Sequence, residues 1–143
     1  MILVDANLLI YARNASLPQH GAAKRWLDEQ FANAPRIGLP WMSLLAFVRI
    51  TTNPRVFPHP LLSQAAWRQV EDWLDLDTVW TPGPTDSHRS VLAKLFTAIS
   101  ITGNLVPDAH LAALAIEHGL ILCSADSNFA RFPGLAWQNP LQD

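Results

Sequence analysis

Three isolated aspartates lie where an apolar strand ends or a helix begins. Asp5 follows the apolar run MILV, Asp108 precedes the apolar helical stretch AHLAALAI, and Asp126 comes just after the run LILC. In an open α/β sheet, ligands bind in the crevice outside the carboxyl ends of the strands. We therefore expect the three carboxylates to converge in a crevice of this kind.

Three carboxylates in one crevice require a cation, because their mutual repulsion otherwise raises the pKa of some of them. Mg²⁺ and Mn²⁺ are hard divalent ions that prefer oxygen ligands. The pattern therefore predicts a Mg²⁺ or Mn²⁺ site formed by Asp5, Asp108 and Asp126. Its expected chemistry is metal-assisted hydrolysis of a phosphodiester bond, and no pairing of Ser or Cys with His predicts a nucleophilic side chain instead.

Each aspartate also has an ordinary structural explanation, and the sequence leaves both explanations open. Asp is a common N-cap at a strand–helix junction, which would account for Asp5. The helix dipole favours an acid in a first helical turn by roughly 0.3–1 kcal/mol, which would account for Asp108. Asp126 lies in the turn-forming run SADSN, where Asp is common. The joint placement of the three acids is what favours a shared site.

The segments around these acids alternate between strand and helix patterns. Apolar runs at residues 1–4 and 120–123 predict buried parallel strands, and helical periodicity between them predicts helices. Pro107 is expected as a first helical residue, Ser63 as an N-cap and Gly119 as a C-cap. The alternation predicts an α/β fold with a central, mostly parallel sheet of four or five strands flanked by helices. Further strands are expected at 37–40 and 78–81, and helices at 7–11, 20–31, 41–51, from Ser63 onward, 86–100 and 107–118.

The composition predicts one compact domain. The chain has 143 residues, of which 50% are hydrophobic and 15% charged, within the common size range of a single domain. The net charge of −2 predicts no strong overall attraction to nucleic acid. A local basic face, or merely solvated helix faces, is indicated by six residues near the N-terminus: Arg13, Lys24, Arg25, Arg36, Arg49 and Arg55.

The expected location is the cytoplasm, without membrane association. The opening residues lack the basic region and cleavage site of a secretory signal. No run approaches the roughly 20 apolar residues that a membrane-spanning helix needs. Cys123 is the only cysteine and lies in an apolar run, which indicates a buried thiol rather than a nucleophile.

The helix expected at residues 41–51 is apolar almost all round, with Arg49 as its only charge. Such a helix either fills a core or forms an interface. The chain also contains six Trp and six Phe, and aromatic residues concentrate at interfaces. We favour a subunit or partner interface, with a well-filled core and a few exposed rings as the alternative.

Together these motifs resemble the PIN-domain ribonucleases, and more closely the VapC toxins of bacterial type II toxin–antitoxin pairs. The resemblance rests on VDAN, NLVPDAHLAALAIEHG and SADSNFARF in this order and spacing, and it extends over the chain to FPGLAWQNPL. It implies a single PIN-like domain over residues 1–143. It also implies RNA cleavage by a Mg²⁺- or Mn²⁺-dependent site in which Asp5, Asp108 and Asp126 match the family's acids.

One position departs from the family pattern. Family members usually carry a Glu in the second helix, in a pattern like LAEL, whereas Phe47 stands there in LLAFVRI. The site then has one carboxylate fewer. Asn7, Ser124 and Asn128 are candidates for neutral oxygen ligands, with waters completing the shell. Arg49 either contacts an RNA phosphate or a partner's carboxylate, or extends to the surface.

Two histidines near the acids are predicted to be structural. His118 lies near the end of its helix, where a protonated imidazole suits the dipole. His110 comes two residues after Asp108, so on a helix it points away from that acid. We expect neither histidine to be catalytic.

Two functions remain open from the sequence. The favoured one is a metal-dependent endoribonuclease in which Asp5 and Asp108 bind the ion. Asp126 then binds the same ion or a second one, or orients the attacking water. The alternative is a catalytically weakened PIN-like module that binds RNA or protein, because Phe47 replaces the Glu. The resemblance also implies a homodimer and a small VapB-like antitoxin as partner.

Overall fold

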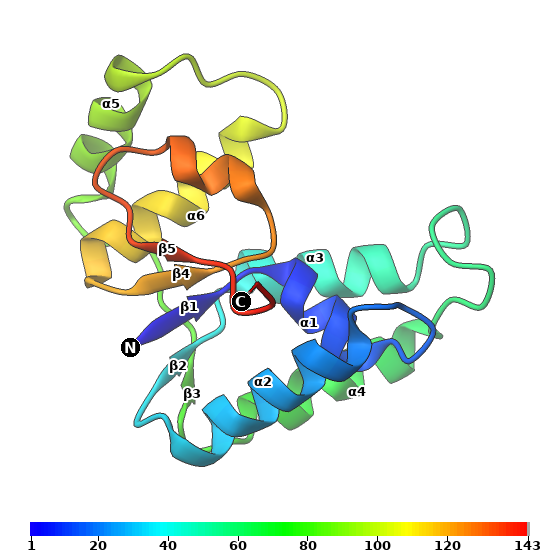
Figure 1. Cartoon of the computed structure of the whole chain (residues 1–143). Coiled ribbons are helices and arrows are strands. Elements are labelled where there is room, and N and C mark those ends of the chain that lie inside the picture. Colours follow the sequence, from blue (N-terminus) through cyan, green and yellow to red (C-terminus); the bar gives the residue numbers. More distant parts are fainter. Residues whose placement is uncertain (143) are drawn as a thin grey trace.

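The computed structural model describes residues 1–142, which form an α/β fold with a parallel sheet at its centre (Figure 1). The sheet has five strands in the order β3-β2-β1-β4-β5, and every neighbouring pair is parallel. This confirms the fold class expected from the alternating pattern. The strands are β1 (Ile2–Val4), β2 (Ile37–Gly38), β3 (Val79–Trp80), β4 (Ile121–Cys123) and β5 (Trp137–Gln138).

Helices cover both faces of the sheet. In Figure 1, α1 to α4 lie on one side of the strands, and α5 and α6 lie on the other. A short 3₁₀ helix, η1, follows β4. The helices are α1 (Ala6–Arg13), α2 (His20–Asn33), α3 (Trp41–Thr51), α4 (Ser63–Leu74), α5 (His88–Ala98), α6 (Leu105–His118) and η1 (Ser127–Arg131).

The central strands divide their side chains between two cores. Val4 and Cys123 are buried with α1 to α4, whereas Leu3 and Leu122 are buried with α5 and α6. Successive side chains of a strand point to opposite faces, so a strand covered on both faces is apolar at every position. This explains why the runs MILV and LILC lack the polar alternation of a half-exposed strand.

Two local expectations about helix ends were wrong. Helix α6 begins at Leu105, so Pro107 is its third residue rather than its first. A proline is tolerated there because the first four N–H groups of a helix have no partner within it. The N-cap of α4 is Leu62, and Ser63 is the first helical residue without a capping bond. Gly119 does end α6 in the left-handed conformation, with φ of 67°.

The position of Cys123 agrees with a further expectation. The Cys123 thiol is buried, and burial raises its pKa to about 12, so it remains protonated at neutral pH. Among the described residues, no helix combines the length and the apolar character needed to cross a bilayer.

Gly38 offers a test of how closely β1, β2 and the segment after β3 pack. A Cβ added to Gly38 would lie 3.0 Å from Leu3 Cδ1 and 3.2 Å from the Ile2 carbonyl oxygen. We predict that Gly38→Ala lowers the free energy of unfolding by roughly 1–3 kcal/mol, because the sheet must shift to admit the methyl group. Urea unfolding followed by circular dichroism measures this change.

Gly21 provides the matched control for that substitution. It lies in α2, and a Cβ added to it would meet no atom within 4 Å. Gly21→Ala should raise stability by up to about 1 kcal/mol, since Ala is the better helix former. Equal effects of the two variants would contradict the close approach at Gly38.

Candidate active site

A cavity of about 560 Å³ lies at the carboxyl ends of β1 and β2, where the helices α1 and α3 begin. Asp5 and Asn7 line it from α1, Asp108 from the first turn of α6, and Ser43 and Arg49 from α3. Three helix N-termini therefore face one space, and each carries a partial positive charge. Such a space suits phosphate groups.

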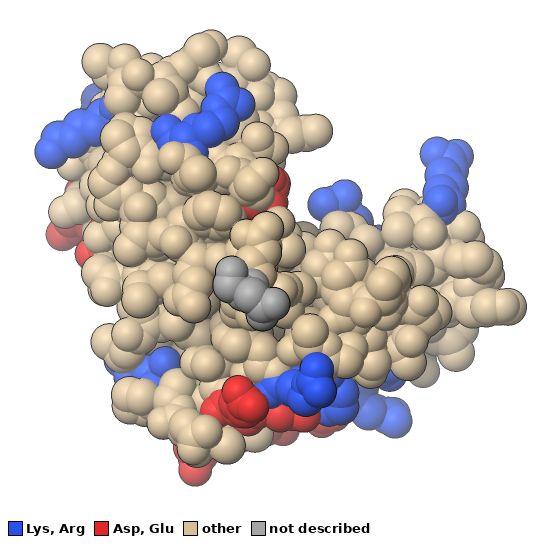
Figure 2. All heavy atoms as spheres, viewed as in Figure 1, with Lys and Arg blue, Asp and Glu red and all other residues tan. Residues whose placement is uncertain are grey.

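The space-filling view shows how this region opens to solvent. Figure 2 shows a notch between the part built on α5 and α6 and the part built on α1 to α4. Acidic side chains are visible on one wall of the notch, and Lys or Arg side chains stand on the other. A polyanion lying in the notch would therefore meet both kinds of charge.

Asp5 is both an N-cap and a residue of the cavity. Its Oδ1 accepts a hydrogen bond of 2.7 Å from the Ala6 N–H, which caps α1. Its Oδ2 accepts bonds from Ser124 Oγ at 2.7 Å and from Asn7 Nδ2 at 3.4 Å. The structural explanation left open by the sequence, an N-cap, therefore holds for Asp5, and the same residue also lines the cavity.

Ser124 connects the end of β4 to the end of β1. Its buried hydroxyl donates to Asp5 and accepts bonds from Asn7 Nδ2 at 3.1 Å and from the Asp126 N–H at 3.0 Å. The Asn7 side-chain oxygen accepts a bond of 3.3 Å from the Ala125 N–H. Two of the three neutral residues proposed beside the acids, Asn7 and Ser124, therefore fix the orientation of the Asp5 carboxylate.

The three carboxylates lie within reach of one another's charge. The pKa of Asp108 is raised to about 6 by burial first, and then by the negative charges of Asp126 and Asp5. Burial also raises the pKa of Asp5, and Asp126 adds to this, whereas the bonds from Ser124 and Ala6 oppose it. Like-charge repulsion of this kind is what a bound cation relieves.

Asp126 and Asn128 lie at the edge of this group. The Asp126 carboxylate accepts a bond of 2.9 Å from the Asn128 N–H and so caps η1. It is not among the residues that line the cavity. The side chain of Asn128 is exposed, and the residue meets the acidic group through its backbone.

The donor set fits a hard divalent cation that keeps part of its water. Within residues 1–142, no group of three His, Cys, Asp or Glu side chains is arranged to hold a metal ion by itself. Mg²⁺, however, is usually bound through one or two carboxylates together with several waters. Asp5 and Asp108 on one cavity, with Asn7 beside them, meet that requirement.

Position 47 does not contribute to the cavity. Phe47 is 0% exposed, and its ring meets Trp73 edge-on with centroids 4.9 Å apart. Helix α3 has the sequence WMSLLAFVRIT and contains no acid. The acidic group therefore receives no carboxylate from α3, and Phe47 packs in the core between α3 and α4.

Ser43 is a cavity residue that the sequence analysis missed. It is 2% exposed, and its hydroxyl has no hydrogen-bond partner in the part of the chain that the structure describes. Its one signal in the sequence was a hydroxyl in the first turn of an otherwise apolar helix. Such a residue is usually taken as a capping or surface serine.

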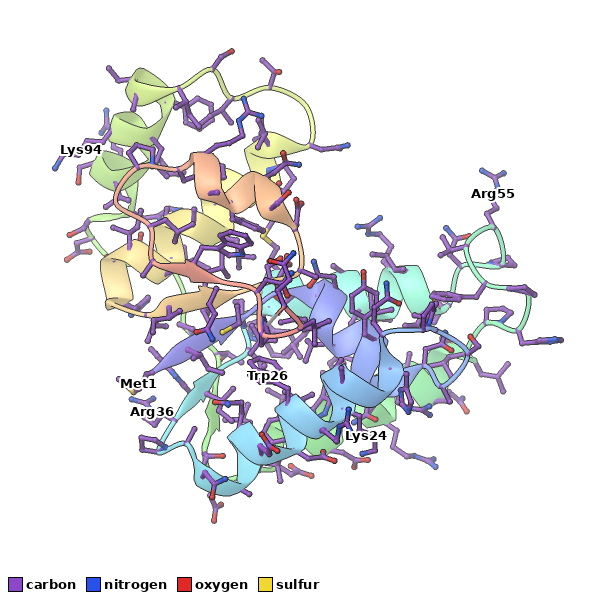
Figure 3. All side chains as sticks on the ribbon, viewed as in Figure 1. Met1, Lys24, Trp26, Arg36, Arg55 and Lys94 are labelled. Carbon is purple, nitrogen blue, oxygen red and sulfur yellow. The ribbon has the colours of Figure 1, made fainter. Side chains whose placement is uncertain are left out.

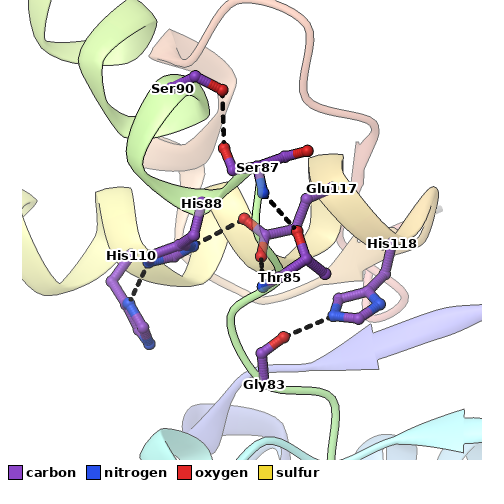
Figure 4. A network of polar contacts seen from close by, with 8 residues as sticks. All are labelled: Gly83, Thr85, Ser87, His88, Ser90, His110, Glu117 and His118. Atoms are coloured by element: carbon purple, nitrogen blue, oxygen red, sulfur yellow. Dashed lines mark hydrogen bonds and ion pairs between the residues drawn. The ribbon is translucent and has the colours of Figure 1, made fainter.

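The histidines belong to a different network (Figure 4). His88 Nδ1 donates to Glu117 Oε2 at 2.7 Å, and His88 Nε2 lies 3.1 Å from His110 Nδ1. His118 Nε2 donates to the Gly83 carbonyl at 2.7 Å. These bonds attach the start of α5 and the segment before it to α6, and none of these residues lines the acidic cavity.

Burial keeps His110 neutral near physiological pH. Its pKa is lowered by burial first and by the charge of His88 second, although Glu117 opposes the shift. Glu117 is itself buried, and its Oε1 accepts a bond of 2.7 Å from the Thr85 N–H. The positions of His110 and His118 agree with the structural roles expected for them.

Comparisons with known proteins point to one family. The family model described as PIN domain matches residues 2–135. The ribonuclease VapC37 of Mycobacterium tuberculosis is 46% identical over 140 residues, which cover 98% of this chain and 97% of that protein.

Two solved structures share the fold. VapBC2 from Rickettsia felis, bound to a DNA fragment from its promoter, aligns with a TM-score of 0.69 and 18% identity, covering 97% of this chain and 98% of that one. VapC20 of M. tuberculosis, a toxin that cleaves the sarcin–ricin loop, aligns with a TM-score of 0.68 and 19% identity, covering 95% and 99%.

Asp108→Asn tests how strongly burial and the neighbouring acids disfavour the charged Asp108 carboxylate in metal-free protein. Because the folded-state pKa of Asp108 is raised from 3.8 to about 6, its stabilising contribution is complete below pH 3.8 and is lost as the pH rises through 6. We predict that, at pH 8, the Asp108→Asn variant unfolds at a higher urea concentration than wild type. Its free energy of unfolding should be higher by about 1 kcal/mol, after allowance for the partial exposure of Asp108. The difference should narrow toward pH 4.

Asp28→Asn is the control for removing one negative charge, because Asp28 forms an exposed ion pair with Lys24. Its effect should stay within about 0.5 kcal/mol at both pH values. Destabilisation by Asp108→Asn at pH 8 in the presence of EDTA would show that burial and the neighbouring acids do not disfavour the charged Asp108 carboxylate.

Proposed function

The chain belongs to the PIN-domain family, and we propose that it is the toxin of a type II toxin–antitoxin pair, an endoribonuclease that hydrolyses phosphodiester bonds in RNA. Its match to a VapC ribonuclease along nearly the whole length supports this function. The sheet also draws strands from both ends of the chain, β1 and β5, which supports one PIN domain over residues 1–143.

The observation that carries this proposal is the acidic cavity at the carboxyl edge of the sheet. Asp5 and Asp108 line it, and both have raised pKa values because burial and neighbouring acids disfavour their charged forms. We assign to these two residues the direct binding of Mg²⁺ or Mn²⁺. Asp126 acts from the edge of the group, where it binds the ion or orients the attacking water.

A divalent ion held by Asp5 and Asp108 would supply charge that polarises a phosphoryl oxygen and would activate a water for attack on the phosphorus. The residues of the chain supply the geometry. Ser124 and Asn7 hold the Asp5 carboxylate in place through the bonds to its Oδ2. The N-termini of α1, α3 and α6 would provide partial positive charge for the phosphate. Because water is the nucleophile, hydrolysis would leave two RNA fragments and would form no covalent intermediate with the protein.

Arginines on and after α3 extend the phosphate-binding surface. Arg49 lines the acidic cavity and is exposed. Figure 3 shows Arg55 projecting from the loop that follows α3, well away from the sheet. RNA bound at the acidic cavity would contact Arg49, and a strand that extended outward along the notch would approach Arg55. Because the net charge of the chain is only −2, such local contacts, rather than the overall field, hold the RNA.

An exposed apolar patch supports a homodimer. The patch consists of Trp41, Leu45 and Trp67, whose exposed fractions are 45%, 55% and 42%. The two indoles are stacked with their centroids 6.3 Å apart. Rigid exposed aromatic rings are typical of interface centres. We therefore propose that a second copy of the chain packs on this patch, against α3 and α4 and next to the acidic cavity.

A small VapB-like antitoxin is the second partner in this proposal. An Arg of the antitoxin entering the cavity would pair with Asp5 and Asp108 as a fork of hydrogen-bond donors. It would thereby neutralise the same charge as the metal ion and exclude it. The fold shared with VapBC2 supports such a partner. Because the proposed substrate is RNA, we also propose that the protein acts in the cytoplasm.

We predict that the purified protein cleaves total RNA in the presence of Mg²⁺ or Mn²⁺ and that EDTA abolishes the reaction. Asp5→Asn and Asp108→Asn should each lower the cleavage rate by about 100-fold or more, because each removes a charge that binds the ion. Gel electrophoresis of cleaved RNA and sequencing of its 5′ ends measure the rate and locate the cleavage sites.

His118→Ala is the control for these variants, because its hydrogen bond to Gly83 lies outside the cavity. It should keep activity within about tenfold, a change of roughly 1.4 kcal/mol in the barrier. Absence of any EDTA-sensitive cleavage by the wild type would favour the alternative function, a PIN-like module that only binds RNA or protein.

The homodimer predicts a doubling of the 15.9 kDa chain mass in solution. Light scattering at tens of micromolar should report the dimer, and Leu45→Glu should convert it to a monomer by placing a charge in the patch. Phe96→Glu is the matched control, since Phe96 is 47% exposed on α5. A monomeric wild type, or dissociation by Phe96→Glu alone, would contradict this interface.

A further inference from the structure

Ser43 is a buried hydroxyl without a partner on the wall of the acidic cavity. It is 2% exposed, it lines the same cavity as Asp5 and Asp108, and none of residues 1–142 forms a hydrogen bond with its Oγ. Buried polar atoms in native proteins are nearly always paired with protein or with ordered water. The arrangement therefore points to an occupant of the cavity.

The position of Ser43 in α3 explains why the helix does not satisfy its hydroxyl. Thr51 and Thr52, later in the same helix, donate to the carbonyls of Phe47 and Val48, four residues earlier, at 2.7 Å each. The residue four before Ser43 is Leu39, which precedes the helix. Pro40 between them has an extended backbone, with ψ of 151°, so Leu39 is not part of a helical turn like those whose carbonyls the two threonines use.

No other side-chain oxygen of α3 lines this cavity. The α3 residues on its wall are Met42, Ser43, Leu45, Ala46, Arg49 and Ile50. The second orphaned buried atom of the described chain, Trp80 Nε1, belongs to β3 and lies outside that lining. Ser43 alone therefore joins an unsatisfied polar atom to the acidic group.

We propose that Ser43 is a positioning residue of this site, whose hydroxyl accepts a hydrogen bond from a water that the divalent ion carries into the cavity. The inference rests on the proposed function, because it needs the ion at Asp5 and Asp108. A water bound to a cation directs its oxygen to the ion and its hydrogens outward, so a neutral hydroxyl that lines the same cavity is a suitable acceptor. Mg²⁺ keeps several such waters, and Ser43 gives α3 a contact with that shell without a carboxylate.

Mn²⁺ titration by calorimetry tests this role without relying on activity. Ser43→Ala should weaken Mn²⁺ binding by about tenfold, as the loss of an outer-shell partner does at other metal sites. The same variant, measured in EDTA, should unfold at the same or a higher temperature than wild type, because the hydroxyl that it removes has no partner in the metal-free protein. Ser43→Thr, which keeps a hydroxyl, should bind Mn²⁺ with the affinity of wild type rather than that of Ser43→Ala.

Thr51→Val is the matched control in the same helix. The Thr51 hydroxyl is buried like that of Ser43, but it is paired with the Phe47 carbonyl, and Thr51 does not line the acidic cavity. Its loss should lower the unfolding temperature and leave Mn²⁺ affinity unchanged. The two substitutions should thus have opposite signatures.

The outcomes separate the role of Ser43 from the proposed function. If Ser43→Ala binds Mn²⁺ as tightly as wild type, the role proposed for Ser43 is wrong but the proposed function stands. If the variant loses stability without losing Mn²⁺ affinity, the hydroxyl has a structural role, and the inference is likewise wrong. If wild type and the Asp5→Asn variant bind Mn²⁺ equally or not at all, the metal site itself fails, and the role of Ser43 falls with it.

Discussion

The pairing of β1 with β4 sets the geometry on which the whole site depends, because it brings together two segments more than a hundred residues apart in the chain. Val4 lies opposite Cys123, and the Asp5 N–H donates to the Cys123 carbonyl at 3.0 Å. The next residues, Asp5 and Ser124, therefore leave the sheet side by side and bond through the Ser124 hydroxyl. A shift of this register by one residue would exchange the faces of the strand and separate the acid from its hydroxyl partner.

The acidic cavity lowers the electrostatic stability of the metal-free fold. Burial and mutual repulsion disfavour the charged carboxylates, while the helix N-termini of α1, α3 and α6 oppose that repulsion with partial positive charge. The hydroxyl of Ser43 is unsatisfied in the same space. Groups that weaken a metal-free protein but suit a bound ion are typical of functional sites. The raised pKa of Asp108 and the unpaired hydroxyl of Ser43 thus share one physical cause, because both are polar groups buried on the wall of the same cavity.

Local patterns in the sequence were sufficient to predict the parallel sheet and the nearness of Asp5 and Asp108, whereas Asp126 lies at the edge of the acidic group rather than on the cavity wall. The runs MILV and LILC carry an apolar residue at every position because both faces of the sheet are covered, and acids at the ends of such strands face the crevice. Side-chain contacts between segments far apart in the chain could not be predicted in this way, because no local pattern in the sequence indicates them. The bond of His88 to Glu117 and the orphaned hydroxyl of Ser43 depend on how helices pack, and β5 has only two residues. The core position of Phe47 against Trp73 likewise depends on how α4 packs against α3.

The most direct test of the metal site is anomalous diffraction from crystals of the protein soaked in Mn²⁺. We predict a single strong anomalous peak, or a close pair, in the acidic cavity within coordination distance of the Asp5 and Asp108 carboxylates. A peak that appears only elsewhere, for example beside His88, His110 and Glu117, would contradict this prediction. A soaked crystal that binds Mn²⁺ nowhere near these aspartates would show that the acids do not form a metal site.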